Sequence, residues 1–448
     1  MLGQNKLEQL AETALSHSKA DQTEIVSYVT DSSLSRFANN AIHQNVFESN
    51  ATLRVRVILG KRTGVAESND ISPEGVKRTV DMARAIAQLQ PENPENAPLP
   101  PPLAPSRVDA YVAHTAQCSP ETRARVIGEV CRQAAAQKLL AAGAFRTDAY
   151  EIAVANSLGA FVYHQGTVAD LRTVMLNEAG TASGYASSAS PDVRRIDGDA
   201  VARTALDKAL RAQNPIALAP GEYTVVLESD AVASILQYLA WNTFNALAVQ
   251  EERSYVRGQR GELLFSPLVN IYDDGTARDG FALPFDHEGV PRQRVVFVEQ
   301  GIARDVVYDT FTARRDHVAS TGHSLPAPNL QGPMPRHLYF APGDKNRDEL
   351  IASVPRGILV TRFWYTRLVH PFHVMMTGLT RDGTFLIENG QLTLPVKNLR
   401  FTSSYIDALK NTRAVGRETK WMRDEQYDMN FCAPAIVVEG FNFTGVTQ

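Results

Sequence analysis

A proline-rich stretch near the end of the first quarter of the chain limits how the rest can fold. Residues 91–105 read PENPENAPLPPPLAP, and seven of these positions are proline. Because the proline ring removes the backbone N–H donor, such a segment is typical of an extended connector rather than of a strand inside a sheet. We therefore expect folded units on both sides of this connector, beginning with a subdomain at residues 1–90.

The units that flank the connector show alternating helix and strand patterns. Residues 4–19 carry apolar side chains at helical spacing, and the Ser-Pro-Glu sequence at residues 72–74 is typical of a helix start. A second Ser-Pro-Glu, at residues 119–121, begins a helix that we expect to extend to about residue 140. Residues 180–190 are rich in Gly, Ala and Ser, and we expect a flexible loop there. The expected strands of the first unit lie at residues 24–29, 32–38, 42–47 and 52–58.

Turn-forming pairs divide the last part of the chain into many short runs. Asp274-Gly275 is one of several Asp-Gly and Asn-Gly pairs that favour tight turns between strands. This pattern predicts a β-rich domain at residues 216–448, preceded by a central α+β subdomain at residues 106–215. One helix, at residues 229–250, is expected near the start of the β-rich domain. The expected fold class is α+β, with an antiparallel sheet in the N-terminal units.

Composition excludes several classes of protein. The chain has 448 residues, of which 44% are hydrophobic and 21% charged, and its formal net charge is -4. This balance is ordinary for a globular protein, and the absence of a long basic run disfavours binding to nucleic acid. No stretch has the roughly 18 to 20 apolar residues of a membrane helix, and charged residues interrupt the N-terminal apolar pattern. We therefore expect a cytoplasmic protein.

Several segments of the C-terminal half share their order and spacing with a known family. They read SYVRGQRGE at residues 254–262, YDDGT at 272–276, FDHEGVP at 285–291 and TGLTRDGTFLIENGQLTLPVKNLRF at 377–401. In these segments the chain resembles the TldD/PmbA metallopeptidases, and the similarity extends over most of its length. The resemblance implies a C-terminal domain of the TldD/PmbA type that contains a metallopeptidase site.

The catalytic motif of that family is replaced in this chain. The resemblance implies that catalytic members of the family carry a His-Glu-x-x-x-His motif on a helix just before the first of these segments. In that motif two imidazoles bind zinc and the glutamate acts as the base. Counted back from residue 254, this window falls on residues 237–242, where the corresponding positions are Gln237, Tyr238 and Asn242. Amide oxygens are weak zinc ligands, and a phenol that titrates near about 10 is a poor base at neutral pH. We therefore expect no catalytic residue on this chain.

Because the zinc motif is missing, the sequence pattern of this chain resembles the TldE/PmbA-type subunit more than the catalytic TldD-type subunit. The resemblance then implies a non-catalytic subunit of a TldD/TldE-type metalloprotease, in which zinc belongs to a TldD-like partner in a heterodimer. It also implies extended or unfolded peptides as substrates, with leader-peptide removal as one such task. One alternative is a homodimer that binds peptides or regulates without proteolysis. Another is an active metallopeptidase with an unrecognised metal site, around His370 and His373 or around His287 and Glu288.

Two other features are candidates for binding. Arg362, Trp364, Tyr365 and Arg367 mix aromatic and cationic side chains in a strand-like segment, and such residues are enriched at interfaces. Strand alternation places Trp364 with Arg362 on one face and Tyr365 with Arg367 on the other. We take these four residues as candidates for contact with substrate or partner, with ordinary packing as the alternative.

His370 and His373 form a candidate metal site, which is weaker than the candidate contact segment. The intervening Pro371 disfavours a helix, and no carboxylate partner is recognisable from the spacing.

Overall fold

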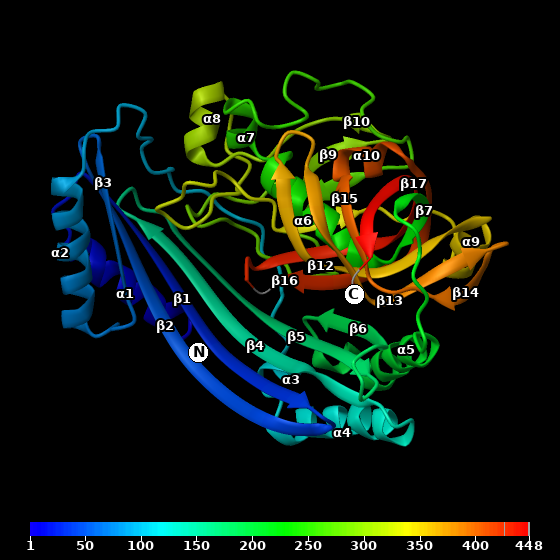
Figure 1. Ribbon diagram of the computed structural model, residues 1–448. Coiled ribbons are helices and arrows are strands. Elements are labelled where there is room, and N and C mark those ends of the chain that lie inside the picture. Colours follow the sequence, from blue (N-terminus) through cyan, green and yellow to red (C-terminus); the bar gives the residue numbers. More distant parts are fainter. Residues whose placement is uncertain (425, 447–448) are drawn as a thin grey trace.

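Two β-sheets organise the chain in the computed structural model, which describes residues 1–424 and 426–446. A six-stranded antiparallel sheet is built from the N-terminal half, and an eleven-stranded mixed sheet is built from the C-terminal half (Figure 1). The expected α+β class, with an antiparallel sheet followed by a β-rich domain, is confirmed. No helix in the described ranges is long and apolar enough to cross a membrane.

The six-stranded sheet has the order β3-β2-β1-β4-β5-β6 and combines strands from both sides of the proline-rich connector. Strands β1 and β4 join the two parts, and Thr30 lies opposite Tyr150 in their register. The strands are β1 (Gln22–Ala38), β2 (Ala41–Leu59), β3 (Arg62–Ser68), β4 (Leu140–Asn156), β5 (Phe161–Leu176) and β6 (Ser183–Ser190).

Strands β1 and β2 correct the expectation of four short strands. They run without a break through residues 30–31 and 48–51, which lie between the expected strands. The ladder continues because its hydrogen bonds involve the backbone, and the polar side chains remain partly or fully exposed. Asn39 and Asn40, with φ values of 50° and 61°, form the two-residue turn between the strands.

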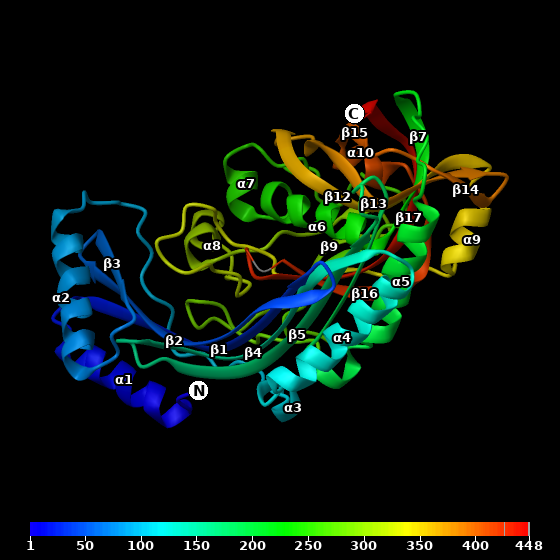
Figure 2. The same ribbon diagram turned by 60° about the horizontal axis from the view of Figure 1, so that its bottom comes forward.

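Helices cover the six-stranded sheet in two groups. Near one end α1 (Gln4–His17) and α2 (Pro73–Leu89) pack on the first three strands, and near the other α4 (Pro120–Ala136) and α5 (Gly198–Arg211) pack on β4 to β6 (Figures 1 and 2). The short α3 (Ala113–Ala116) precedes α4. Ser72 and Ser119 cap α2 and α4 by accepting bonds from Gly75 N and Thr122 N, as the Ser-Pro-Glu starts predict.

Two expectations for the central unit are wrong. The helix at residue 120 ends at Ala136, because Lys138 adopts φ 57° and turns the chain into β4. Residues 183–190 form β6 rather than a loop. Their small side chains let α5 approach the strand closely: a Cβ at Gly184 would lie 2.2 Å from the carbonyl oxygen of Ala205.

The eleven-stranded sheet closes partly on itself. Along its path the order is β10-β9-β8-β11-β17-β15-β13-β12-β7, and β7 also pairs with β17, so five strands form a ring. Strands β14 and β16 pair with β13 and β17. The strands are β7 (Gly221–Leu227), β8 (Ile271–Asp273), β9 (Val295–Glu299), β10 (Ile302–Ala303), β11 (His337–Phe340), β12 (Arg356–His370), β13 (Met375–Glu388), β14 (Gln391–Pro395), β15 (Leu399–Ser404), β16 (Thr412–Asp424) and β17 (Met429–Val446).

The helix expected at residues 229–250 is interrupted. It forms α6 (Ser229–Asn242) and α7 (Ala246–Gln250), separated by a turn in which Phe244 is fully buried and stacks on Phe297 with ring centroids 4.5 Å apart. Asn245 then caps α7 by accepting from Ala248 N. The short helices α8 (Thr310–Asp316), α9 (Arg347–Ala352) and α10 (Tyr405–Lys410) complete the domain.

Candidate functional site

Helix α6 carries the window at residues 237–242 in which the resemblance implies a zinc motif, and its polar side chains are engaged in internal bonds. The amide nitrogen of Gln237 donates to a carboxylate oxygen of Asp424 on β16. The hydroxyl of Tyr238 donates to the carbonyl oxygen of Thr366 on β12, at 3.0 Å. The amide nitrogen of Asn242 donates to the carbonyl oxygen of Tyr238, at 2.8 Å. The first two bonds tie α6 to neighbouring strands, and the third remains inside the helix.

This set of donors does not fit a zinc ion. Catalytic zinc takes imidazole, thiolate or carboxylate ligands and leaves a position open for water. The window offers two neutral amide groups and a phenol, and one amide already binds a carboxylate. Among residues 1–424 and 426–446 no group of three or more His, Cys, Asp or Glu side chains is placed to hold a metal.

The structure brings no third metal donor to either alternative pair within the described residues. His370 and His373 lie at the turn after β12 with ring centroids 5.6 Å apart, and His373 packs against Phe372. His287 is paired through Nδ1 with the carbonyl oxygen of Ser324, and Glu288 accepts bonds from Arg56. The bonds of His287 and Glu288 therefore attach the turn around residue 287 to neighbouring segments of the chain.

The aromatic and cationic segment lies beside the window. A pocket of about 460 Å³ is lined by Gln237 and Tyr238 of α6 and by all four residues of the segment; we call it the α6 pocket. The side-chain pairs expected from strand alternation are in contact. The Arg362 guanidinium lies 5.1 Å from the ring centroid of Trp364, and that of Arg367 lies 4.3 Å from Tyr365.

The strand irregularity at this segment was not expected. Tyr365 has a φ of 53°, and the β12–β13 register shifts between Trp364 and Arg367. The bulge leaves Tyr365 69% exposed at the mouth of the pocket.

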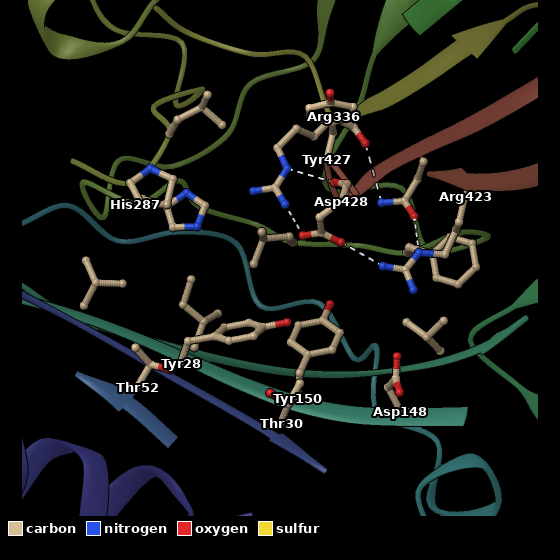
Figure 3. A pocket seen from close by; sticks show the side chains of 18 of the residues that line it. Tyr28, Thr30, Thr52, Asp148, Tyr150, His287, Arg336, Arg423, Tyr427 and Asp428 are labelled. Atoms are coloured by element: carbon tan, nitrogen blue, oxygen red, sulfur yellow. Dashed lines mark hydrogen bonds and ion pairs between the residues drawn. The ribbon is translucent and has the colours of Figure 1, made fainter. Parts of the chain in front are cut away.

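Arg336, Arg423 and Asp428 form a network next to the α6 pocket that sequence reasoning did not find. Figure 3 shows Asp428 between the two guanidinium groups, and it accepts from Arg423 Nη2 at 2.7 Å and from Arg336. Removal from bulk water alone would raise the pKa of Asp428, but the two arginines outweigh this and hold the pKa well below its usual range. Because Arg336 and Asp428 are 92 positions apart, no local pattern signals their pairing.

The family-like segment at residues 272–276 lies in the domain interior rather than at the pocket. Asp273, fully buried at the end of β8, accepts from His323 Nε2 at 3.0 Å and from His337 N at 2.7 Å. The next residue, Asp274, accepts from Thr276 N at 2.9 Å, as expected for a capped turn. This segment therefore holds strands and loops together.

Comparison with known proteins places these features in a family. A family model for the PmbA/TldA metallopeptidase C-terminal domain matches residues 220–445, and models for domain 1 and the central domain match residues 23–87 and 119–213. The metalloprotease TldD homolog of Haemophilus influenzae is 25% identical, over 91% of this chain and 87% of that protein. Metalloprotease PmbA of Escherichia coli O157:H7 is 24% identical, over 92% and 91%.

A solved structure shares the fold of this chain. The crystal structure of TldE from Thermococcus kodakarensis superposes with a TM-score of 0.89 at 22% identity, covering 98% of this chain and 100% of that one. The resemblance seen in the motifs is thereby confirmed, and the chain belongs to the TldD/PmbA family of metallopeptidases.

Proposed function

We propose that this chain is the non-catalytic, TldE-like subunit of a two-chain metalloprotease whose zinc and catalytic residues belong to a TldD-type partner. The observation that carries the proposal is the use of the window residues as structural bonds. Gln237, Tyr238 and Asn242 each donate to another group of the chain, and none supplies an imidazole or a carboxylate. Similarity to proteins named metalloproteases over nine-tenths of the chain supports a role in the same process.

Extended or unfolded peptides are the proposed substrates, processed by the complex in the cytoplasm. The α6 pocket supports this choice because aromatic and arginine side chains line it beside a hairpin whose end is exposed. Tyrosine, tryptophan and arginine contribute most strongly where proteins meet peptides or other proteins. Removal of leader segments from peptides is a task of this chemical class. In this scheme the segment from Arg362 to Arg367 contacts the partner or the peptide that the partner cuts.

Reconstitution of peptide cleavage tests the proposal. The chain, a TldD-type protein and their equimolar mixture are each incubated with an unfolded peptide, and cleavage is followed by mass spectrometry. We expect cleavage by the mixture and none by this chain alone. A mixture in which the partner's His-Glu-x-x-x-His motif is changed to alanine serves as the control and should be inactive. Cleavage by the isolated chain would overturn the proposal.

A further inference from the structure

A second cavity, of about 520 Å³, lies between the six-stranded sheet and the C-terminal domain. We call it the chamber. Its floor includes Tyr28 and Tyr150, and its roof includes His287 and Asp428, which face the strands from the opposite side (Figure 3). The volume lies within the range of roughly 300–1,000 Å³ typical of ligand sites. The residues that line it include none from α6, although Arg423, Gln426 and Tyr427 line both cavities.

The floor of the chamber is an aromatic surface on paired strands. Tyr28 of β1 and Tyr150 of β4 stack with ring centroids 6.2 Å apart, and Tyr28 is 38% exposed. Opposite them lie apolar side chains of the C-terminal domain, including Phe281 and Leu283. An aromatic face that opens into a partly apolar cavity favours an apolar or aromatic ligand group. Since β1 and β4 are each paired on both sides, a ligand here is recognised by side chains rather than by strand addition.

Every charged side chain that lines the chamber has a partner of opposite sign there, with Asp428 shared by two arginines. A charged ligand would compete with these ion pairs. The side chains of Arg336 and Arg423 are only 7% and 10% exposed, so breaking their pairs with Asp428 would leave a poorly solvated charge without its partner. A neutral ligand leaves the pairs intact. The pairs are Arg336 with Asp428, Arg423 with Asp428, Arg54 with Glu67 and Arg146 with Asp148.

His287 adds an unused hydrogen-bond acceptor to the roof. Its Nδ1 lies 3.1 Å from the carbonyl oxygen of Ser324. Because a carbonyl oxygen only accepts, Nδ1 carries the proton and Nε2 of the neutral ring is an acceptor. Burial and the nearby Arg336 lower the pKa of His287 to about 3, so the ring is neutral at physiological pH. No other residue in the described part of the chain bonds to this imidazole.

From this geometry we propose that the chamber binds an uncharged segment of polypeptide. An apolar or aromatic side chain of the ligand packs on Tyr28 and Tyr150, and a main-chain N–H donates to Nε2 of His287. The choice of a peptide rests on the proposed function. The chamber adds a binding site separate from the α6 pocket and a preference for neutral sequences, so it selects which part of a substrate this subunit holds.

Calorimetric titration of the full chain tests the chamber. The probe is a tetrapeptide, acetylated and amidated at its ends, with leucine and phenylalanine between two glycines. We expect measurable binding of this peptide and at least tenfold weaker binding when the leucine is replaced by aspartate or lysine. Equal affinity for the neutral and charged peptides would overturn the proposal.

Two substitutions of His287 separate its acceptor from its structural bond. His287→Asn retains an N–H donor near Ser324 but lacks the Nε2 acceptor, and we expect roughly fivefold to tenfold weaker binding from the loss of one hydrogen bond. His287→Gln carries an amide oxygen near the Nε2 position and should restore part of the affinity. Unchanged affinity in the folded Asn variant would contradict the role of His287.

A filling substitution gives a second, independent test. Thr52 lies directly opposite Tyr28 in the register of β1 and β2, so its side chain shares the face that lines the chamber. We expect Thr52→Trp to abolish binding, whereas Thr393→Trp, at an exposed position of β14 outside the chamber, should leave it unchanged. Full binding by Thr52→Trp would place the peptide elsewhere.

Failure of this inference is distinguishable from failure of the proposed function. If the chamber variants bind peptide normally but the mixture with a TldD-type partner cleaves, the chamber proposal fails and the subunit role stands. If peptide binding depends on His287 and Thr52 but the mixture with a TldD-type partner does not cleave peptide, the proposed subunit role fails and the chamber proposal stands.

Discussion

The α6 pocket and the chamber border each other, yet their polar groups are used differently. In the α6 pocket, Gln237 and Tyr238 donate to Asp424 and Thr366 and so hold the fold together. In the chamber, His287 lines the cavity with its ring held in place by a bond at Nδ1, which leaves Nε2 as an acceptor. Under the proposed function, this difference shows how a protease fold replaces its catalytic groups by structural bonds and still presents groups suited to a ligand.

The anchoring of α6 gives the largest expected effect on stability. Glu228 precedes this helix and accepts from Lys208 and, at 3.0 Å, from Arg347. Lys208 is 7% exposed, so Glu228→Ala leaves a buried ammonium group unpaired. We expect the free energy of unfolding to fall by about 3–5 kcal/mol, measured by urea denaturation. The exposed Glu12 provides the control, since Glu12→Ala should change stability by less than about 0.5 kcal/mol. Equal effects of the two substitutions would contradict the role of Glu228.

The same carboxylate predicts a dependence of stability on pH. Burial alone would raise the pKa of Glu228, but Lys208 and Arg347 outweigh it and lower the pKa to about 2, from 4.5 in the unfolded chain. A lowered folded-state pKa stabilises the fold above pH 4.5, and this contribution, roughly 3 kcal/mol, is lost as the pH falls from 4.5 to 2. We expect Glu228→Gln to remove this part of the acid sensitivity in denaturation curves. An unchanged slope between pH 4.5 and 2 would rule the contribution out.

Restoring the catalytic motif tests whether the α6 pocket has lost more than three side chains. The combined change Gln237→His, Tyr238→Glu and Asn242→His removes three hydrogen bonds, and we expect a loss of about 3 kcal/mol in unfolding free energy. We expect no full peptidase activity, because the described residues hold no group of three or more His, Cys, Asp or Glu side chains placed for a metal, although the carboxylate of Asp424 lies beside residue 237. Cleavage at the rate of a catalytic relative would show that the rest of the site is intact.

The smallest stability effect is expected at the mouth of the α6 pocket. Tyr365 is 69% exposed, so Tyr365→Ala should change the unfolding free energy by less than about 0.5 kcal/mol. If the residue contacts a partner or a peptide, its removal weakens that association by about tenfold, as for a moderate interface hot spot. Affinity is measured by calorimetry for the TldD-type partner and for the peptide. Leu330→Ala, at a 92% exposed site, is the control, and an equal effect there would exclude a specific contact.

Local patterns predicted the features of the molecule that depend on nearby residues. Helical periodicity placed Gln237, Tyr238 and Asn242 on one helix, and the turn pairs predicted the β-rich domain. The continuity of β1 and β2 was missed at residues 30–31 and 48–51, because side-chain polarity does not determine whether a backbone ladder continues. The chamber was missed for a different reason. Its walls come from segments between residues 26 and 430 that are far apart in the sequence, and no local residue spacing indicates that these segments lie close together in the fold.

Zinc stoichiometry tests the central claim most directly. The complex of this chain with a TldD-type protein is analysed by native mass spectrometry, then dissociated, and the zinc in each chain is measured. We predict one zinc ion per pair of chains, carried by the TldD-type protein, and none retained by this chain. A second zinc ion per pair, or zinc bound in equal amount to this chain after separation, would contradict the account.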